Sequence, residues 1–250
     1  ETLAKTMDYV QKIRKTPIVV NDSRGFYTSR VFGTYTGEGV AMLAEGIKPA
    51  LIENAGKMTG MPMAPLALSD AVALDLAWKV TTQTKKDFEA EGKEFPITPM
   101  YSIMEEMVEK QGRFGKKNNK GFYEYPENGK KYLWPELSNL CKESDDQPDV
   151  EELKKRFLYI QALETAKCYE ENVLTDVRDA DIGAILGWGM APWTGGTLSF
   201  IDMVGVKNFV AEADKLAQKY GDRFTPCKLL RDMAAKNETF HKSGNSSQAA

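Results

Sequence analysis

Histidine is almost absent from this sequence: the single histidine, His241, lies near the C-terminus in a polar stretch. A general base needs a fixed partner and a pocket, and a polar tail supplies neither. We therefore expect His241 to be a solvated residue without a catalytic role. No Cys/His or Ser/His pair and no cluster with metal-ligand spacing remains. The sequence thus predicts no metal site and no complete catalytic apparatus in this chain.

Cysteines, basic blocks and long apolar runs are also scarce. The three cysteines are an odd number without metal spacing, which suits free thiols in a reducing cytoplasm. The formal charge is −3 and no basic block occurs, which argues against a nucleic-acid partner. No apolar run approaches the roughly 18 residues that cross a membrane, and no signal-peptide pattern is present. We expect a cytoplasmic protein without a transmembrane segment.

A dinucleotide-binding loop is missing as well. Gly33, Gly37 and Gly39 do not form the G-x-G-x-x-G pattern after a strand, so we expect no cofactor-binding residue in this chain. These glycines lie within a predicted helix, where each costs up to about 1 kcal/mol relative to alanine. Gly33 and Gly37 lie four residues apart and share one helix face. Because of this cost, we expect another backbone to pack closely where Gly33, Gly37 and Gly39 lie.

What the sequence does contain is an internal repeat. Residues 30–65 and 156–192 share residues in the same order, at an offset of 126 that becomes 127 after one inserted residue. The matched pairs are Arg30 with Arg156, Glu38 with Glu164, Glu45 with Glu171, Gly60 with Gly187, and Met63-Ala64-Pro65 with Met190-Ala191-Pro192. This period is too long for a solenoid and has the length of a small domain.

The repeat predicts a duplicated helical domain. We expect a first copy at 1–140 with a lead-in helix at 1–16, a linker at 141–150, a second, degenerate copy at 151–240, and a disordered tail at 241–250. We also expect residues 26–60 and 152–187 to pack against each other about a pseudo-two-fold axis. A chain with two copies can form this contact between its own copies, so we expect it to be a monomeric pseudo-dimer.

Hydrophobic periodicity predicts a mostly α protein, because helical spacing recurs along the chain and strand-like runs are few. The expected helices span residues 2–14, 26–45, 49–59, 66–90, 100–111, 151–170, 177–186, 206–220 and 226–236. Residues 18–20 and 121–125 are expected to be extended, and 143–149 to form a polar linker. Residues 243–248 have the composition of a disordered tail.

Four short motifs occur in order before residue 126. They are V-V-N-D-S-R-G-F-Y-T-S-R at 19–30, G-M-P-M-A-P at 60–65, L-S-D at 68–70, and R-F-G-K-K-N at 113–118 followed by G-F-Y-E-Y at 121–125. In these motifs the chain resembles the C-terminal domain of 3-hydroxyacyl-CoA dehydrogenases. The second copy resembles the one that the large multifunctional fatty-acid oxidation α-subunits add after the first.

The resemblance implies a helical domain of the 6-phosphogluconate dehydrogenase C-terminal-like type. In the family, a separate Rossmann domain binds NAD and supplies the catalytic His–Glu pair, so the resemblance implies that both lie outside this chain. The family's Asn near the thioester end of the substrate is replaced here by Ser29, and the usual proline by Arg24. Ser29 is the implied catalytic residue of this chain, and Ser29, Met63 and Pro65 are the implied substrate-binding residues.

Structural alternatives stay open for each of these residues. Ser29 also suits a helix packing contact, and Met63 and Pro65 also suit a turn between helices. The position that matches Ser29 in the second copy is Lys155, so the second copy is expected to serve structure.

The function implied by the resemblance is that of the substrate-side part of an NAD-dependent L-3-hydroxyacyl-CoA dehydrogenase of fatty-acid β-oxidation. The complete enzyme would oxidise 3-hydroxyacyl-CoA to 3-ketoacyl-CoA, and this chain alone would be inactive. The implied partners are an acyl-CoA substrate bound together with the Rossmann domain, and a thiolase subunit. The alternative is a non-catalytic helical assembly or interaction module. A usable polar group at position 29 favours the first interpretation.

Overall fold

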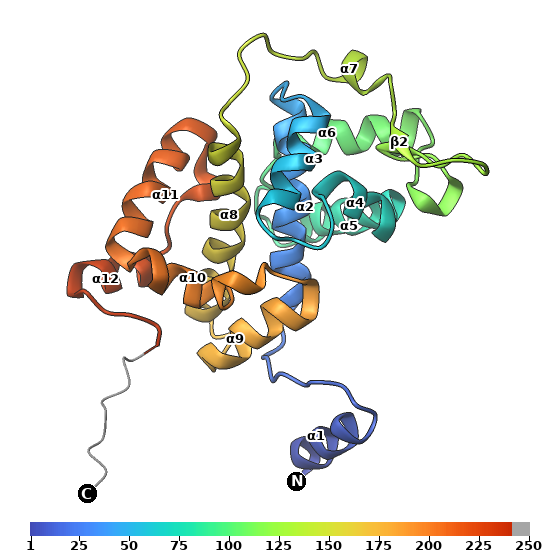
Figure 1. The fold of residues 1–250 in the computed structure, drawn as a ribbon. Helices are drawn as coiled ribbons and strands as arrows, with labels where there is room; N and C mark the ends of the chain where they lie inside the picture. Colours follow the sequence, from blue (N-terminus) through green and yellow to red (C-terminus); the bar gives the residue numbers. More distant parts are fainter. Residues whose placement is uncertain (242–250) are drawn as a thin grey trace, which may run out of the picture. The chain divides into compact units, whose positions relative to one another are not determined.

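The computed structural model describes residues 1–241, which are mostly helical, as the sequence predicts (Figure 1). The first part of the chain contains α1 (Thr2–Lys12), α2 (Thr28–Ala44), α3 (Pro49–Met58), α4 (Pro65–Val72), α5 (Leu74–Ala90), α6 (Pro99–Glu105) and α7 (Leu137–Leu140). The second part contains α8 (Val150–Glu170), α9 (Val177–Gly183), α10 (Thr197–Val204), α11 (Val206–Tyr220) and α12 (Lys228–Lys236). Short π-helices extend α6 and α9, as η1 (Glu106–Lys110) and η3 (Ala184–Trp188).

Strands in the described residues are confined to one small hairpin. β1 (Tyr123–Glu124) pairs antiparallel with β2 (Tyr132–Leu133), with Tyr123 opposite Leu133. The extended segment expected at 121–125 therefore holds a strand. The predicted disordered segment at 243–248 and most of the predicted tail at 241–250 lie outside the described residues.

The structure differs from the helical predictions between residues 66 and 90, and it contains α7 and α10, which were not predicted. The predicted helix at 66–90 is interrupted at Ala73, whose φ of 81° lies in the left-handed region. The break lets the next residue, Leu74, donate its N–H to the carbonyl of Phe114 and bury its side chain completely. Helix α10 was missed, because its first N–H groups are capped by Asp181, a residue distant in sequence, which makes no local capping pattern.

The chain forms two compact units, one of residues 1–32 with 158 onward and one of residues 33–157. The division falls inside α2 and α8, so each of these long helices contributes to both units. The predicted copy boundaries stay a prediction, because the units are defined by contacts and the copies by repetition.

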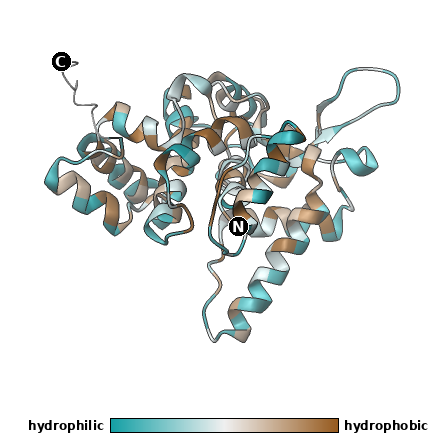
Figure 2. Cartoon of the chain, turned by 90° about the horizontal axis from the view of Figure 1, so that it is seen from below, coloured by the Kyte–Doolittle hydropathy of each residue, from teal (hydrophilic) through white to brown (hydrophobic). Residues whose placement is uncertain are grey.

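Along the helices, apolar and polar residues alternate in the manner of amphipathic helices (Figure 2).

The unit of residues 33–157 is built around α2 and the first turns of α8. The rings of Tyr35 and Phe157 lie 5.1 Å apart in its core. The guanidinium of Arg156 is completely buried and holds two carboxylates of α2 and its C-terminal end: Nε lies 2.7 Å from Oε1 of Glu38, and Nη1 lies 2.7 Å from Oε2 of Glu45. Such a burial is tolerated because the charge is paired and hydrogen-bonded.

The unit of residues 1–32 and 158 onward contains the equivalent set of arginine–glutamate ion pairs. Arg30 places Nη2 2.6 Å from Oε1 of Glu164, and Nη1 2.6 Å from Oε2 of Glu171. These residues are the repeat partners of those around Arg156, with the copies exchanged. In both sets an arginine of one copy binds the glutamates of the other. That reciprocity is the pattern of an isologous contact, in which residue i meets j and j meets i.

Of the three glycines at which close packing is expected, only Gly39 is closely packed, and the prediction is wrong for Gly33 and Gly37. A Cβ added at Gly33 would meet open space, and one at Gly37 would meet only the flexible side chain of Met100. The close packing lies at Gly39 and also at Gly56 of α3, where an added Cβ would come within 2.6 and 2.5 Å of the ring of Pro65. The face of α2 that carries Gly39 is the one against the turn leading into α4, and no periodicity in α2 alone identifies it.

Candidate functional site

Ser29 lies in the first turn of α2, and its neighbours on both sides are fixed by residues from the second half of the chain. Tyr27 is fully buried and donates a hydrogen bond to the carbonyl oxygen of Ala180 at 2.8 Å, and burial raises its pKa above the usual range. Arg30 is held by Glu164 and Glu171. Ser29 itself is exposed, and within the described residues its hydroxyl forms no hydrogen bond. The turn therefore presents a free hydroxyl on a rigidly anchored backbone.

The segment that leads into this turn is also anchored. Val20 forms an isolated antiparallel bridge with Leu174, and the N–H of Asn21 donates to the carbonyl of Val173 at 2.9 Å. The N–H of Val19 donates to Oδ2 of Asp179 at 3.2 Å. The run expected to be extended is thus extended, and it is paired with the chain that follows α8.

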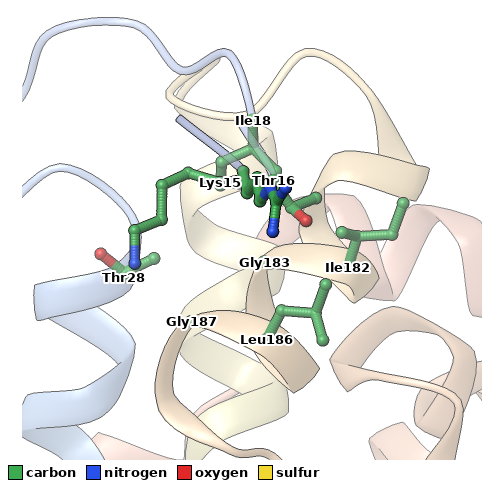
Figure 3. A pocket seen from close by; sticks show the side chains of 9 residues that line it. Lys15, Thr16, Ile18, Thr28, Ile182, Gly183, Leu186 and Gly187 are labelled. Carbon is green, nitrogen blue, oxygen red and sulfur yellow. The ribbon is translucent and has the colours of Figure 1, made fainter. Parts of the chain in front are cut away.

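A pocket of about 380 Å³ lies beside the start of α2 (Figure 3). It is lined by Arg14, Lys15, Ile18 and Thr28 from the first segment and by Ile182 and Leu186 from α9 and η3. Thr28 precedes Ser29 directly, whereas Ser29 does not line this pocket.

Met63 and Pro65 belong to the other compact unit and occupy different environments. Met63 is half-buried and lines a pocket of about 270 Å³ together with Glu53, Tyr123 and Lys131. Pro65 is buried against Gly39 and Gly56 and does not line that pocket. The structure thus brings Met63 to a cavity and Pro65 into the packing of α2, α3 and α4. Their assignment as substrate-binding residues remains a prediction.

Two buried carboxylates organise the surroundings of Met63. Glu53 accepts hydrogen bonds from the N–H groups of Leu66 and Ala67, at 2.7 and 3.2 Å, and from the Tyr123 hydroxyl at 2.5 Å. It therefore caps the N-terminus of α4. Burial raises the pKa of Glu53, and the three hydrogen bonds oppose that shift.

Asp70, in the last turn of α4, binds the backbone at the start of β1, which lies within the fourth motif. It accepts the N–H groups of Phe122 and Tyr123 at 2.8 and 2.9 Å and the Tyr125 hydroxyl at 3.0 Å. Burial raises its pKa to about 6, against the lowering effect of these donors. The sequence motifs at 68–70 and 121–125 meet through this carboxylate, which gives both a structural role.

The second half of the chain repeats this arrangement. Asp181 accepts the N–H of Leu198 at 2.9 Å and so caps α10, as Glu53 caps α4. Asp202 accepts the N–H groups of Phe240 and His241 at 2.9 and 2.8 Å, as Asp70 does for the Phe-Tyr pair. His241 completes the parallel, because its Nε2 lies 2.8 Å from Oδ2 of Asp181.

The prediction of a solvated His241 is therefore wrong. The hydrogen bonds from the N–H groups of Phe240 and His241 to Asp202 hold His241 in place. No local sequence pattern predicts this contact. The neighbouring Ser199 donates to Asp181 at 2.6 Å, and the same Nε2 of His241 faces both Ser199 and Asp181. A serine nucleophile relay needs the carboxylate on one ring nitrogen and the serine on the other. This cluster instead resembles the structural carboxylate site of the first copy.

The described residues contain no group of histidines, cysteines or carboxylates arranged to hold a metal ion. No helix in the same part of the chain is both long and apolar enough to cross a membrane. Each cysteine has a raised pKa because of burial, to about 11 for Cys141 and about 12 for Cys168.

Residues 25–125 match the family model described as the C-terminal domain of 3-hydroxyacyl-CoA dehydrogenase. This segment is a 3-hydroxyacyl-CoA dehydrogenase C-terminal domain. All three predicted site residues and all four motifs except the start of the first lie within it, whereas the second copy lies outside the match.

Two solved structures share the fold of most of the chain. One is the 3-hydroxybutyryl-CoA dehydrogenase of Escherichia coli K12, with a TM-score of 0.69 and 20% identity over 94% of this chain and 64% of that one. The other is the dehydrogenase part of multifunctional enzyme 1 from C. elegans, with a TM-score of 0.62 and 18% identity over 93% of this chain and 53% of that one. The chain thus spans less than two thirds of either protein's length.

Proposed function

We propose that this chain is the substrate-side helical part of an NAD-dependent L-3-hydroxyacyl-CoA dehydrogenase acting in cytoplasmic fatty-acid β-oxidation. The observation that carries the proposal is the match of residues 25–125 to the dehydrogenase C-terminal domain. In the complete enzyme, NAD bound by a Rossmann domain would accept the hydride from C3 of the substrate. This chain would close the acyl side of the cleft and be inactive alone, and a thiolase subunit is a candidate partner.

Ser29 is the residue of this chain that we assign to the substrate. Its hydroxyl is exposed and unbonded among the described residues, and the backbone that carries it is anchored by Tyr27 and Arg30. A hydroxyl both donates and accepts, so it suits a carbonyl or hydroxyl at the thioester end of a substrate. Because no protein group bonds this hydroxyl among the described residues, a substrate would displace only water from it.

The test uses the complete dehydrogenase and the variant Ser29→Ala. We expect kcat/KM for L-3-hydroxyacyl-CoA to fall several-fold while NADH affinity stays unchanged, since one hydrogen bond is worth about 0.5–1.5 kcal/mol. Ser29→Asn restores the residue typical of the family and should retain activity. Ser138→Ala, which removes an exposed hydroxyl that donates to the carbonyl of Pro135, serves as a control far from Ser29 in the sequence. Unchanged turnover and KM in Ser29→Ala would assign Ser29 to packing.

The alternative of a non-catalytic assembly module has one observation in its favour. Helix α1 buries none of its residues, and its apolar side chains Leu3 and Tyr9 are exposed. An amphipathic helix with an uncovered apolar face fits a docking element. The Ser29→Ala measurement separates the two functions, because a module without a catalytic role has no kinetic dependence on that hydroxyl.

A further inference from the structure

The pocket beside the start of α2 has walls of two different kinds. One wall is apolar: Ile182 of α9 and Leu186 of η3 are 42% and 66% exposed, although both are large aliphatic residues. The lining also includes the cationic side chains of Arg14 and Lys15. Figure 3 shows the Lys15 side chain extending across the pocket toward Thr28.

The walls are held in place before any ligand arrives. Gly183 brings the segment before α2 close to α9, because an added Cβ there would lie 2.7 Å from Cδ1 of Ile18. The N–H of Val19 is fastened to Asp179 in the first turn of α9. Arg14, two residues after the end of α1, has a φ of 59°, an uncommon left-handed conformation for a residue with a side chain. The π-helical turn η3, which carries Leu186, is a feature often found at functional sites.

The cations of the lining are available to a ligand. Within the described residues neither Arg14 nor Lys15 forms an ion pair, and both side chains are exposed. The hydroxyls of Thr16 and Thr28 add two neutral hydrogen-bonding groups to the lining. A binding site with an exposed aliphatic wall and unpaired cations in its lining is complementary to a ligand with an apolar chain and an anionic group.

We infer that this pocket binds the apolar chain of an anionic acyl compound, with Ile182 and Leu186 against the chain and Arg14 and Lys15 near the anionic group. Its identification with an acyl-CoA rests on the proposed function. The inference gives the second half of the chain a part in ligand binding, although it carries Lys155 in place of Ser29. The acyl chain-length preference would then depend on α9 and η3.

Titration calorimetry of this chain with octanoyl-CoA, CoA and octanoate tests the inference. We expect octanoyl-CoA to bind more tightly than CoA. Leu186→Glu should weaken octanoyl-CoA at least about tenfold, which corresponds to about 1.4 kcal/mol, and leave CoA unchanged. Lys15→Glu should weaken both. Leu76→Glu, at a leucine of α5 that is 52% exposed, and Lys207→Glu, at an exposed lysine of α11, are the matched controls and should change neither.

Several outcomes would overturn the inference: CoA binding as tightly as octanoyl-CoA, Leu186→Glu behaving like Leu76→Glu, or no binding of any probe. Octanoate binding as tightly as octanoyl-CoA would support the acyl site and identify a free acid anion as its ligand. Leu186→Ala, checked by circular dichroism, keeps the test decisive if the charged variant unfolds. None of these variants touches Ser29, so failure here leaves the kinetic test of the proposed function intact.

Discussion

The buried Arg156 network offers a direct test of the reciprocal contact between the copies. Arg156→Met keeps an apolar side chain while removing the cation that faces Glu38 and Glu45. Arg156 is 0% exposed and Glu38 is 2% exposed, so the substitution leaves a buried carboxylate without this cation. Breaking a buried ion pair by removing one partner costs about 3–5 kcal/mol. We expect a loss of that size in the free energy of unfolding.

Arg30→Met is the matched comparison, because Arg30 holds the same place in the other copy. Its side chain is 19% exposed, and its partner Glu171 is 50% exposed. Solvent therefore screens the charges that remain, and we expect a loss of about 1–2 kcal/mol. The two arginines thus have equivalent partners, and burial alone separates the predicted effects.

Urea unfolding followed by circular dichroism measures both losses, and amide hydrogen exchange in α2 and α8 locates them. The double variant Arg156→Met with Glu38→Leu should recover a large part of the stability, because the cost arises from an uncompensated buried charge. Equal losses for Arg156→Met and Arg30→Met would refute the reasoning. So would a loss below about 1 kcal/mol for Arg156→Met, the value typical of an exposed pair.

Three other measurements test the remaining arguments. Gly39→Ala should lower the free energy of unfolding by about 1–3 kcal/mol, because the methyl group would meet Pro65. Gly33→Ala faces open space and should be neutral or stabilising by up to about 1 kcal/mol. Equal unfolding midpoints in urea for the two variants would contradict this. Cys168 should resist iodoacetamide at pH 8 until the chain is unfolded, as mass spectrometry can show, since burial raises its pKa to about 12. Because the folded state favours the thiol, this residue's contribution to stability is present below about pH 9 and is lost as the pH rises toward 12. The isolated chain should give no heat of specific binding with NADH, and micromolar affinity would contradict the assignment of NAD to another domain.

The local motifs and periodicity predicted the helical class, most helix positions and the family of the first copy. Helical spacing, and helix-ending residues such as Thr16-Pro17, act within a few residues. Their structural consequences can therefore be predicted from the local sequence. The repeat of Arg30, Glu38 and Glu45 at Arg156, Glu164 and Glu171 likewise belongs to the sequence. It predicted an internal contact without showing which atoms make it.

Tertiary structure decided which repeated residues meet and which groups are buried. The exchange of arginines and glutamates between copies, the capping of α4 by Glu53 and α10 by Asp181, and the capture of His241 by Asp202 all join residues far apart in the chain. The same is true of the pocket that Ile182 and Leu186 line together with Arg14 and Lys15. Local propensity carries no information about such partners, because their energy comes from burial and pairing that exist only after the helices have packed.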